Sequence, residues 1–509
     1  MKTKRTFSIL IPLAALLCGC GGGPGPEASS SAPSSSEESK TSSSSAPSAS
    51  SSASAPTGEV NISFWSTGSQ GLITQLKALA EEFETAVKKQ TGVTVNVDIT
   101  VEGSYDDIAN KISKGLAVGN IPNMAVAYPD TVANILAKEA DKEYLYDLEP
   151  YFADAEIGFG TQEYLGDSAT AGRRDIISSF LDEGTHYARE GTFSYPFMKS
   201  SEVMFYKVDE IERAYKYYNP EIIGIENIRK DLASMDWDKF VTLLESIDEN
   251  KAKISNTLEK AAWYDSDSNW FISQMYQRGI PYTSINGGKG KIEFESGQNR
   301  TDAEDMVQDF KDMFDDGLIT TKGVENTYGS YAFADGKVLF EIGSSGGTGY
   351  NMPEGLDPED IGIVPVPAAG EKLYVSQGPT ITFLKNPTVD AATNDLQMKY
   401  SWQFAKFLTN PAANVRLCIR GSEGYIPIRY SAFEDADYME FLEEPSIYAT
   451  AAKVLIDEIA DSYYNAPVFP GSAELRDLVG GILPQVFKSG ENITDAFKNA
   501  IDKAKTFMK

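Results

Sequence analysis

Histidine and cysteine are almost absent from this sequence of 509 residues, which has one histidine and three cysteines. A zinc site needs several clustered histidine or cysteine ligands. A histidine-dependent catalytic triad would have to use His186, and no neighbouring motif marks it as more than a loop residue. The scarcity of both residues argues against a zinc site and against a histidine-dependent triad. We predict no metal, no cofactor and no catalytic residue, although the many acidic residues leave carboxylate-based catalysis open.

Positive charge is also scarce. Lysine and arginine number 45 against 74 acidic residues, so the formal net charge is −29. A surface this acidic repels nucleic acid and anionic lipid, and we expect neither as a partner. We attribute the charge to solubility. An anionic ligand stays compatible with it, since one buried arginine reverses the field around itself.

The first twenty residues are predicted to be a targeting segment. A positively charged start precedes an apolar run from Phe7 to Leu17, which is too short to span a bilayer as a helix. The run ends in Leu17-Cys18-Gly19-Cys20, which resembles the bacterial lipobox. The resemblance implies a lipid on Cys20. A plain secretory signal with two incidental cysteines is the alternative.

Residues 21–57 are predicted to be a disordered, Ser-rich tether. Sixteen of the 26 residues from Ser29 to Ser54 are serine, so the segment has little apolar surface with which to offset the entropy of ordering. After processing at Cys20, Cys418 is the one free thiol, so no internal disulfide is expected. A lipidated cysteine on a solvated tether places the folded part just outside a membrane.

The folded part, residues 58–509, is too long for a single core at about 450 residues, which predicts two lobes. Its start alternates strands and helices. Strands are predicted at 60–64, 93–101 and 124–127, and helices from the apolar sets Leu72, Leu76, Leu79, Phe83, Val87 and Ile108, Ile112, Leu116. This order predicts an α/β fold whose sheet is covered by helices.

Later segments have mostly helical patterns. Residues 205–330 and the chain from about Asn394 are predicted to be largely helical. The clearest helices are expected at 237–247, 306–314, 402–408, 451–459 and 475–487. Gly92 is expected to end the first helix of the folded part.

Two short polar loops follow the first two strands, at 66–69 and 102–105. In parallel α/β sheets ligands bind beyond the carboxyl ends of the strands, where these loops lie. They are candidates for binding hydroxyl groups. The alternative is that they are ordinary turns.

Eight short segments stand out in order along the folded part. They are Phe64-Trp65-Ser66, 103–107, 119–122, Tyr195-Pro196-Phe197, 200–206, 333–337, 424–428 and 469–476. Together they resemble extracellular solute-binding protein family 1, the binding lipoproteins of ABC importers. Within that family the pattern is similar to the glycerol-3-phosphate-binding members and their sugar-binding relatives.

The resemblance implies a type II periplasmic-binding-protein-like fold, with two α/β lobes and a hinge that the chain crosses three times. We place the crossings near 197–203, 333–338 and 384–388. The N-terminal lobe would then hold 58–198 plus 336–386, and the C-terminal lobe 199–335 plus 387–509.

The resemblance also implies ligand-binding residues. Carried over position by position, they are Tyr105, Ser200, Ser345, Gly378, Tyr425 and Arg476. A family glutamate falls on Pro129, with Asp130 adjacent, so this contact departs from the pattern. A tryptophan that stacks on the ligand matches Trp270, and less clearly Trp263.

Each candidate has a structural alternative. Arg476 is expected near the start of a helix capped by Ser472, where it would grip a phosphate or a pair of hydroxyls, or form a salt bridge with a nearby carboxylate. The tryptophans Trp65, Trp263 and Trp270 would stack on a sugar or fill the core. The Gly-rich segment 343–349 lacks the signature of a nucleotide-binding loop, and we interpret it as a cleft lining.

The predicted function is to capture a carbohydrate or glycerol-3-phosphate-like solute outside the membrane and deliver it to an ABC permease, as a monomer without enzymatic activity. A surface glycoside hydrolase remains the main alternative, because it needs only two carboxylates. A surface adhesin is a third class, and it would show no stabilisation by small ligands.

Overall fold

The computed structural model describes residues 58–139, 142–168, 172–421 and 424–508. All of them belong to one compact unit, Ala55–Lys509. The predicted signal peptide, the lipidation at Cys20 and the tether lie outside the described residues. Within the described part, no helix combines the length and the apolar character that crossing a bilayer demands.

The first lobe is built on a five-stranded sheet with the order β2-β1-β3-β13-β4. Its strands are β1 (Glu59–Ser66), β2 (Thr94–Val101), β3 (Met124–Ala127), β13 (Thr380–Phe383) and β4 (Tyr195–Pro196). The first three are parallel, whereas β13 runs antiparallel to both β3 and β4. The three strands predicted from alternation at the start of the folded part are confirmed.

The helix between β1 and β2 shows why its sequence folds as predicted. Helix α1 (Gln70–Thr91) buries its whole predicted apolar face. Ser69 caps its start, since the Ser69 hydroxyl accepts a hydrogen bond from the Leu72 amide. Gly92 ends it with φ 77°, a left-handed conformation that glycine adopts without strain.

The second lobe is built on another five-stranded sheet, with the order β11-β5-β10-β6-β9. Its strands are β11 (Ile361–Pro365), β5 (Glu202–Lys207), β10 (Val338–Ser344), β6 (Lys260–Tyr264) and β9 (Ile319–Thr321). Every residue of β5 is buried, so the strand shows no alternation of polar and apolar residues. Residues 205–330 are mostly helical, as predicted, because β5 overlaps only their start and the strands between their helices are short.

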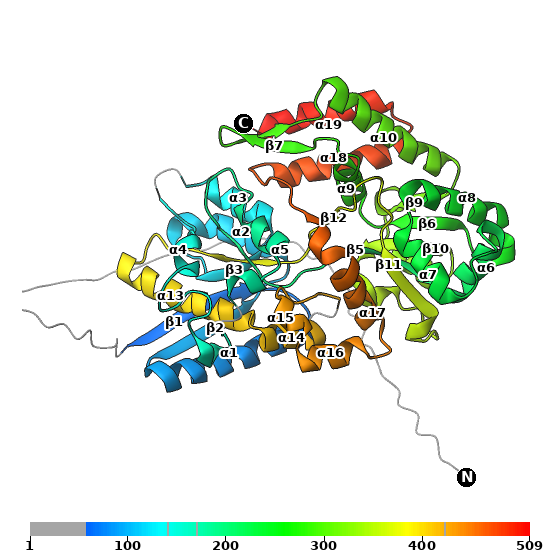
Figure 1. Cartoon of the computed structure of the whole chain (residues 1–509). Coiled ribbons are helices and arrows are strands. Elements are labelled where there is room, and N and C mark those ends of the chain that lie inside the picture. The colour runs from blue at the N-terminus through cyan, green and yellow to red at the C-terminus, as the bar shows by residue number, and fades with distance from the viewer. Residues whose placement is uncertain (1–57, 140–141, 169–171, 422–423, 509) are drawn as a thin grey trace, which may run out of the picture. The chain divides into compact units, whose positions relative to one another are not determined.

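Helices cover both sheets, and all five helices singled out in the later sequence are confirmed (Figure 1). Up to residue 277 they are α2 (Tyr105–Gly115), α3 (Pro129–Leu136), α4 (Glu149–Phe152), α5 (Ser178–Asp182), α6 (Val208–Tyr218), α7 (Ile225–Ser234), α8 (Trp237–Ile254) and α9 (Asp267–Gln277). Beyond it they are α10 (Gly297–Asp315), α11 (Lys322–Glu325), α12 (Gly329–Ala334), α13 (Ala391–Leu408), α14 (Pro411–Arg420), α15 (Tyr430–Phe433), α16 (Ala436–Leu442), α17 (Ile447–Val454), α18 (Ser472–Phe487) and α19 (Ile493–Phe507).

The lobe boundaries differ from those predicted. Strands β10 and β11 pair with β5 in the second sheet, although 336–386 was expected in the first lobe. Conversely, α13 packs against β1, although 387–509 was expected in the second lobe. The predicted crossings near 333–338 and 384–388 are therefore wrong. The crossings were placed from the resemblance, and periodicity gave no independent check, because it does not identify the pairing partners of fully buried strands.

The chain crosses between the lobes in three segments. The first joins β4 to β5 through 197–201, the second joins β11 to β13 through 366–379, and the third joins α16 to α18 through 443–471. These segments bond to one another. Ser200 and Gln377 exchange two backbone hydrogen bonds of 3.0 Å, and β12 (Tyr374–Val375) pairs in parallel with β14 (Tyr463–Tyr464).

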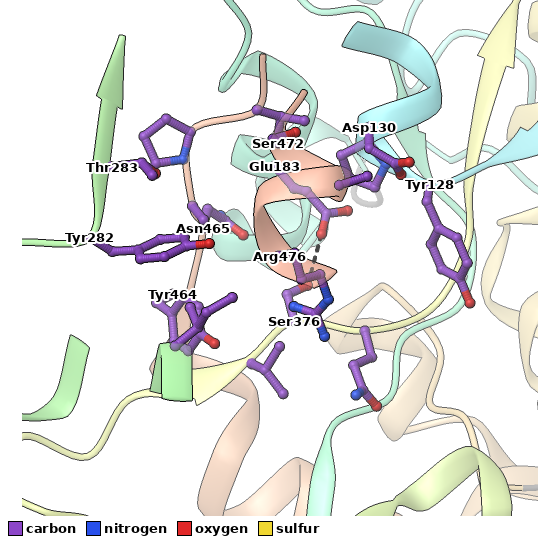
Figure 2. A pocket seen from close by; sticks show the side chains of 18 of the residues that line it. Tyr128, Asp130, Glu183, Tyr282, Thr283, Ser376, Tyr464, Asn465, Ser472 and Arg476 are labelled. Atoms are coloured by element: carbon purple, nitrogen blue, oxygen red, sulfur yellow. Dashed lines mark hydrogen bonds between the residues drawn. The ribbon is translucent and has the colours of Figure 1, made fainter. Parts of the chain in front are cut away.

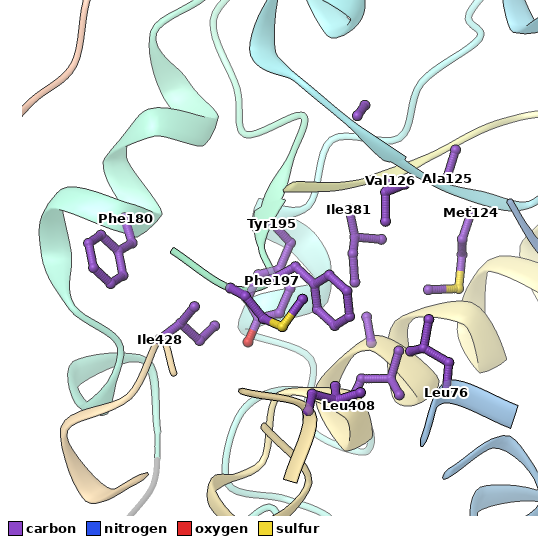
Figure 3. Close-up of a cluster of buried hydrophobic side chains, with 14 of the residues drawn as sticks. Leu76, Met124, Ala125, Val126, Phe180, Tyr195, Phe197, Ile381, Leu408 and Ile428 are labelled. Carbon is purple, nitrogen blue, oxygen red and sulfur yellow. The ribbon is translucent and has the colours of Figure 1, made fainter. Parts of the chain in front are cut away.

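The buried apolar residues form two large cores, and the first also includes residues of the second sheet, such as Phe205 and Ile363. Figure 3 shows part of the first, where Leu76, Val126 and Ile381 lie near Phe197. Phe197 is fully buried at the start of the first crossing segment. The core of the first lobe thus anchors one end of the hinge.

Candidate ligand-binding site

A cavity of about 580 Å³ lies between the lobes, beside the crossing segments (Figure 2). The first lobe contributes residues 128–130 and Glu183 to its lining. The crossings contribute 375–378 and 464–469, and the second lobe contributes the start of α18 and residues 282–283. Its size lies in the range typical of small-molecule sites, roughly 300–1,000 Å³.

The first-lobe wall begins directly after β3, at the carboxyl end of a parallel strand. Tyr128 precedes α3, Pro129 is the first residue of that helix, and Asp130 follows in its first turn. Burial raises the pKa of Asp130, although hydrogen bonds with backbone amides partly offset it. The strand end thus presents a phenol and a carboxylate to the cavity.

The floor is formed where the first two crossings bond to each other, at Ser200, Gln377 and Gly378. Gly378 has φ 102°, and a Cβ there would lie 2.4 Å from the Met198 carbonyl oxygen. Glycine is therefore required for the two crossings to approach this closely.

Arg476 projects into the centre of the cavity from α18 (Figure 2). Its guanidinium donates to the Asn269 amide oxygen, and Asn269 in turn donates to Glu202 over 2.6 Å. The Tyr264 hydroxyl donates to the other oxygen of Glu202 over 2.7 Å. We call these four residues the Arg476 relay. Because each partner is buried, the relay fixes the direction of the guanidinium.

The carboxyl group of the relay is unusually hard to ionise. Burial raises the pKa of Glu202 to about 7, although the hydrogen bonds from Tyr264 and Asn269 and the charge of Arg476 favour its ionised form. Protonation near neutral pH therefore changes the charge beneath Arg476.

A second charged group is fixed from the first lobe. Glu183 lines the cavity and accepts hydrogen bonds from the fully buried ammonium of Lys199 and, over 3.1 Å, from the Ser376 hydroxyl. Both partners lie in crossing segments. The lone pairs of Glu183 that these bonds leave open can accept hydrogen bonds from ligand hydroxyls.

Tyrosines gather at the edge of the first-lobe wall. The rings of Tyr105 and Tyr128 lie with centroids 4.5 Å apart, and a Cβ on Gly346 would lie 3.1 Å from the Tyr425 side chain. Burial raises the pKa of Tyr105 and of Tyr425, so both hydroxyls stay protonated and able to donate at neutral pH. Aromatic faces next to hydroxyl groups suit the alternating apolar and polar surface of a sugar.

A family model described as bacterial extracellular solute-binding protein matches residues 78–442, more than half of the chain. This chain belongs to that family. The match confirms the resemblance seen in the sequence. As an extracellular solute-binding protein, the chain works outside the cytoplasm and binds a solute, as predicted.

Solved structures of similar fold include three binding proteins, each related at low sequence identity. MalE of Xanthomonas citri has a TM-score of 0.64 at 14% identity, over 87% of this chain and 96% of that one. The cyclic α-maltosyl-1,6-maltose binding protein of Arthrobacter globiformis has 0.62 at 16%, over 88% and 98%. UgpB of Mycobacterium tuberculosis, in complex with glycerophosphocholine, has 0.59 at 17%, over 88% and 98%. No curated protein matches the chain.

These likenesses confirm the fold class, a type II periplasmic-binding-protein-like arrangement of two α/β lobes. At such low identity they bear on the fold alone. The glycoside hydrolase alternative gains no support from the family match.

The structure brings together five of the eight residues that the resemblance singled out in this solute-binding protein. Asp130, Ser200, Gly378, Tyr425 and Arg476 all line the cavity. The arginine hydrogen-bonds an amide oxygen rather than the carboxylate that was considered as an alternative. Contact of these five residues with a ligand remains a prediction.

Two predicted residues lie just behind the lining. The Tyr105 ring packs at a tilt of 43° against Tyr128, which itself lines the cavity. Ser345 is buried and its hydroxyl donates to the Gly424 carbonyl over 2.7 Å. In the Gly-rich segment 343–349, Ser344 is the one residue that lines the cavity, as far as the structure describes its lining. Tyr105 and Ser345 therefore support the lining residues rather than line the cavity themselves.

The prediction for Trp270 needs correction. Its side chain is fully buried in the second core, where its ring lies 4.2 Å from that of Phe310 and 5.4 Å from that of Tyr264. It is absent from the cavity lining, as are Trp263 and Trp65. The bulk of the indole ring fills the space under α9 instead, which was the alternative considered for tryptophan.

A smaller correction concerns the start of α18. Gly471, with φ 92°, precedes the helix, and Ser472 is its first residue rather than its cap. Ser472 does not cap the helix, and it lines the cavity.

Sequence reasoning missed Glu183, Tyr282, Thr283, Tyr464 and Asn465, all of which line the cavity. One signal for two of them was present. The pair Gly287-Gly288 between short polar strands is typical of a tight hairpin, and the structure has strands β7 (Thr283–Asn286) and β8 (Lys289–Ile292) there. Nothing in the sequence indicated that this hairpin would face the ligand site.

Proposed function

We propose that this extracellular solute-binding protein captures a carbohydrate and delivers it to an ABC permease. The observation that carries the proposal is the charge of the cavity lining. Among the residues that the structure describes, three carboxylates, Asp130, Glu183 and Asp477, line the cavity together with one guanidinium, that of Arg476.

This balance favours a neutral, hydroxyl-rich ligand over a phosphorylated one. A phosphate monoester carries up to two negative charges and would meet nearby carboxylates that repel it. Sugar hydroxyls instead donate to Asp130 and Glu183 and accept from Arg476. Charge-assisted hydrogen bonds of this kind are about twice as strong as neutral ones.

The capture mechanism follows from where the fixed groups lie. Glu183 belongs to the first lobe and Arg476 to the second, while Ser200 and Gly378 lie on crossing segments. A ligand that bonds to both lobes stabilises the conformation in which they face each other. The closed conformation would be the form that the permease recognises.

The proposal includes the location and the state of the protein. A lipid on Cys20 would hold it at the outer face of the cell membrane, and residues 21–57 would act as the tether. We further propose that it acts as a monomer and catalyses no reaction. Chromatography of oligosaccharides incubated with the protein tests the last point, and product release would contradict it.

A thermal-shift screen tests the choice of ligand, with mono- and disaccharides in one arm and glycerol-3-phosphate and glycerophosphocholine in the other. We expect sugars to raise the melting temperature, since binding to the folded state stabilises it. Stabilisation by the phosphorylated compounds alone would show that the carbohydrate assignment is wrong.

Arg476→Ala tests the site itself. Losing hydrogen bonds from a charged donor should weaken sugar binding by about 2–3 kcal/mol, roughly 30- to 150-fold in Kd by calorimetry. Arg229→Ala serves as the matched control, because Arg229 lies in the same lobe, bonds to Glu458 and does not line the cavity. Equal affinity of the Arg476→Ala variant and the control would remove Arg476 from the site.

A further inference from the structure

The sequence resemblance gives no role to the residues of one cavity wall. It is formed by Tyr282, Thr283 and Asn465, which we call the hairpin wall. Tyr128 and Asp130 lie on the opposite side of Arg476 (Figure 2). The cavity therefore has two separate polar ends with the guanidinium between them.

Each residue of the hairpin wall has a buried polar atom without a partner among the described residues. These atoms are the Tyr282 hydroxyl oxygen, the Thr283 hydroxyl oxygen and the Asn465 amide oxygen. Tyr282 is only 6% exposed, and its hydroxyl points toward the middle of the cavity (Figure 2). Buried polar groups are nearly always hydrogen-bonded, so three orphans on one wall indicate a polar ligand there.

The hairpin wall is rigid, as a binding surface should be. The ring of Tyr282 stacks on that of Phe294, with centroids 5.7 Å apart and planes 8° apart. The Asn465 amide nitrogen donates to the Ser179 carbonyl over 2.7 Å, which leaves the amide oxygen for a ligand. Both side chains are therefore already oriented, and binding sacrifices little side-chain entropy.

The hairpin itself is fixed against the third crossing. Gly287 and Gly288, with φ 59° and 76°, form the tight turn between β7 and β8. A Cβ on Gly290 would lie 2.1 Å from the Phe469 ring, so glycine lets Phe469 pack directly on the hairpin. Thr283, at the start of β7, is thereby held at the cavity.

The chemistry of the wall selects its ligand. Two hydroxyls can each donate or accept, whereas the amide oxygen of Asn465 only accepts, so the ligand must supply hydroxyl donors as well as acceptors. The three atoms carry no formal charge and suit neither an anion nor an apolar group. Tyr464, beside them, adds an aromatic ring held by stacking on Tyr276 at 4.2 Å.

We propose that the hairpin wall is a second sugar subsite, so that the ligand is a disaccharide or a longer oligosaccharide rather than a single hexose. The inference rests on the proposed carbohydrate function. One ring occupies the end near Tyr128 and Asp130, the next ring lies against the hairpin wall, and Arg476 contacts both near their linkage.

Calorimetry on the purified protein tests the subsite, using a disaccharide that raises the melting temperature, such as maltose, cellobiose, lactose, trehalose or sucrose, and its constituent monosaccharides. We expect the disaccharide to bind at least tenfold more tightly. Tyr282→Phe and Thr283→Val remove only the unpartnered hydroxyls, and each should weaken disaccharide binding by about three- to tenfold while leaving monosaccharide binding unchanged. Tyr276→Phe is the matched control, since Tyr276 stacks on Tyr464 outside the described lining.

The possible results test the second subsite and the carbohydrate function separately. A monosaccharide that binds as tightly as the disaccharide, or hairpin-wall variants that bind the disaccharide like wild type, would overturn the subsite and leave the carbohydrate function standing. Stabilisation by glycerophosphocholine with no response to any sugar would overturn both. Because the Tyr282 hydroxyl has no partner among the described residues, Tyr282→Phe should also fold normally, and an unaltered melting temperature without ligand checks this.

Discussion

Glu202 offers a sharp test of the electrostatics beneath the cavity. It is 4% exposed, and burial raises the pKa of its carboxyl group to about 7 from an ordinary value of 4.5. The change to test is Glu202→Gln, which keeps the shape of the side chain and removes its titration. The Gln amide can still accept from Asn269.

The size of the effect follows from linkage. Raising a carboxyl pKa from 4.5 to about 7 corresponds to about 3 kcal/mol between the two protonation states. Because the folded-state pKa lies above the unfolded one, this stabilisation is complete below pH 4.5 and is lost as the pH rises through 7. The free energy of unfolding of Glu202→Gln should therefore exceed that of wild type increasingly between pH 4.5 and 8, by about 3 kcal/mol at the upper end.

Differential scanning calorimetry from pH 4.5 to 8 measures the difference. For about 450 residues that unfold together, 3 kcal/mol corresponds to about 3–4 °C in melting temperature. Burial also raises the pKa values of Asp265 and Glu341, and the charge of Glu202 contributes to the raised pKa of Glu341. The measured difference therefore includes this coupling as well as the titration of Glu202 itself. Tyr264→Phe provides a second check, because loss of the hydrogen bond to Glu202 should raise its pKa and move the transition to higher pH. A melting-temperature difference that stays constant over this pH range would refute the reasoning.

Two further predictions address the core and the hinge. Trp270→Ala should destabilise the protein by about 3–5 kcal/mol, because it leaves a cavity beside Phe310, while sugar affinity by calorimetry stays within twofold; a selective loss of affinity would restore Trp270 to the site. Gly378→Ala should lower stability by about 1–3 kcal/mol and weaken sugar binding, since its φ of 102° and the nearby Met198 carbonyl leave no room for a Cβ. The control Gly347→Ala, where a Cβ would meet nothing within 4 Å, should be neutral; equal melting temperatures of the two alanine variants would contradict the argument.

The first lobe could be predicted from the sequence because its strands and helices show regular periodicity. Strand β1 alternates buried and exposed positions, and α1 has apolar residues at helical spacing, so local pattern and tertiary role agree. The second sheet could not be predicted in this way. Its central strands β5 and β10 are buried almost throughout, and a continuous apolar run does not tell which strand it pairs with.

The residues of the site also differ in how far the sequence predicts them. Asp130, Ser200 and Arg476 sit beside short motifs that also determine the local backbone, such as the strand end before Pro129, so the motif located them. Thr283 and Asn465 owe their position to packing that links distant segments, through Gly290 on Phe469 and through the bond to Ser179. No local pattern encodes such a contact, which is why the hairpin wall was missed.

Charge is the property for which the sequence is least informative. The formal charge of −29 counts every carboxyl group as ionised and was attributed to a solvated surface. Burial, with Asp265 nearby, raises the pKa of the unexposed Glu341 well above its usual value. Burial also raises the pKa of Glu202, beneath Arg476, to about 7. The field that a ligand meets depends on which of these groups hold a proton, and burial decides that. Comparing sugar affinity with phosphate affinity across the pH range of the Glu202 transition would therefore measure a property of the fold that composition alone cannot provide.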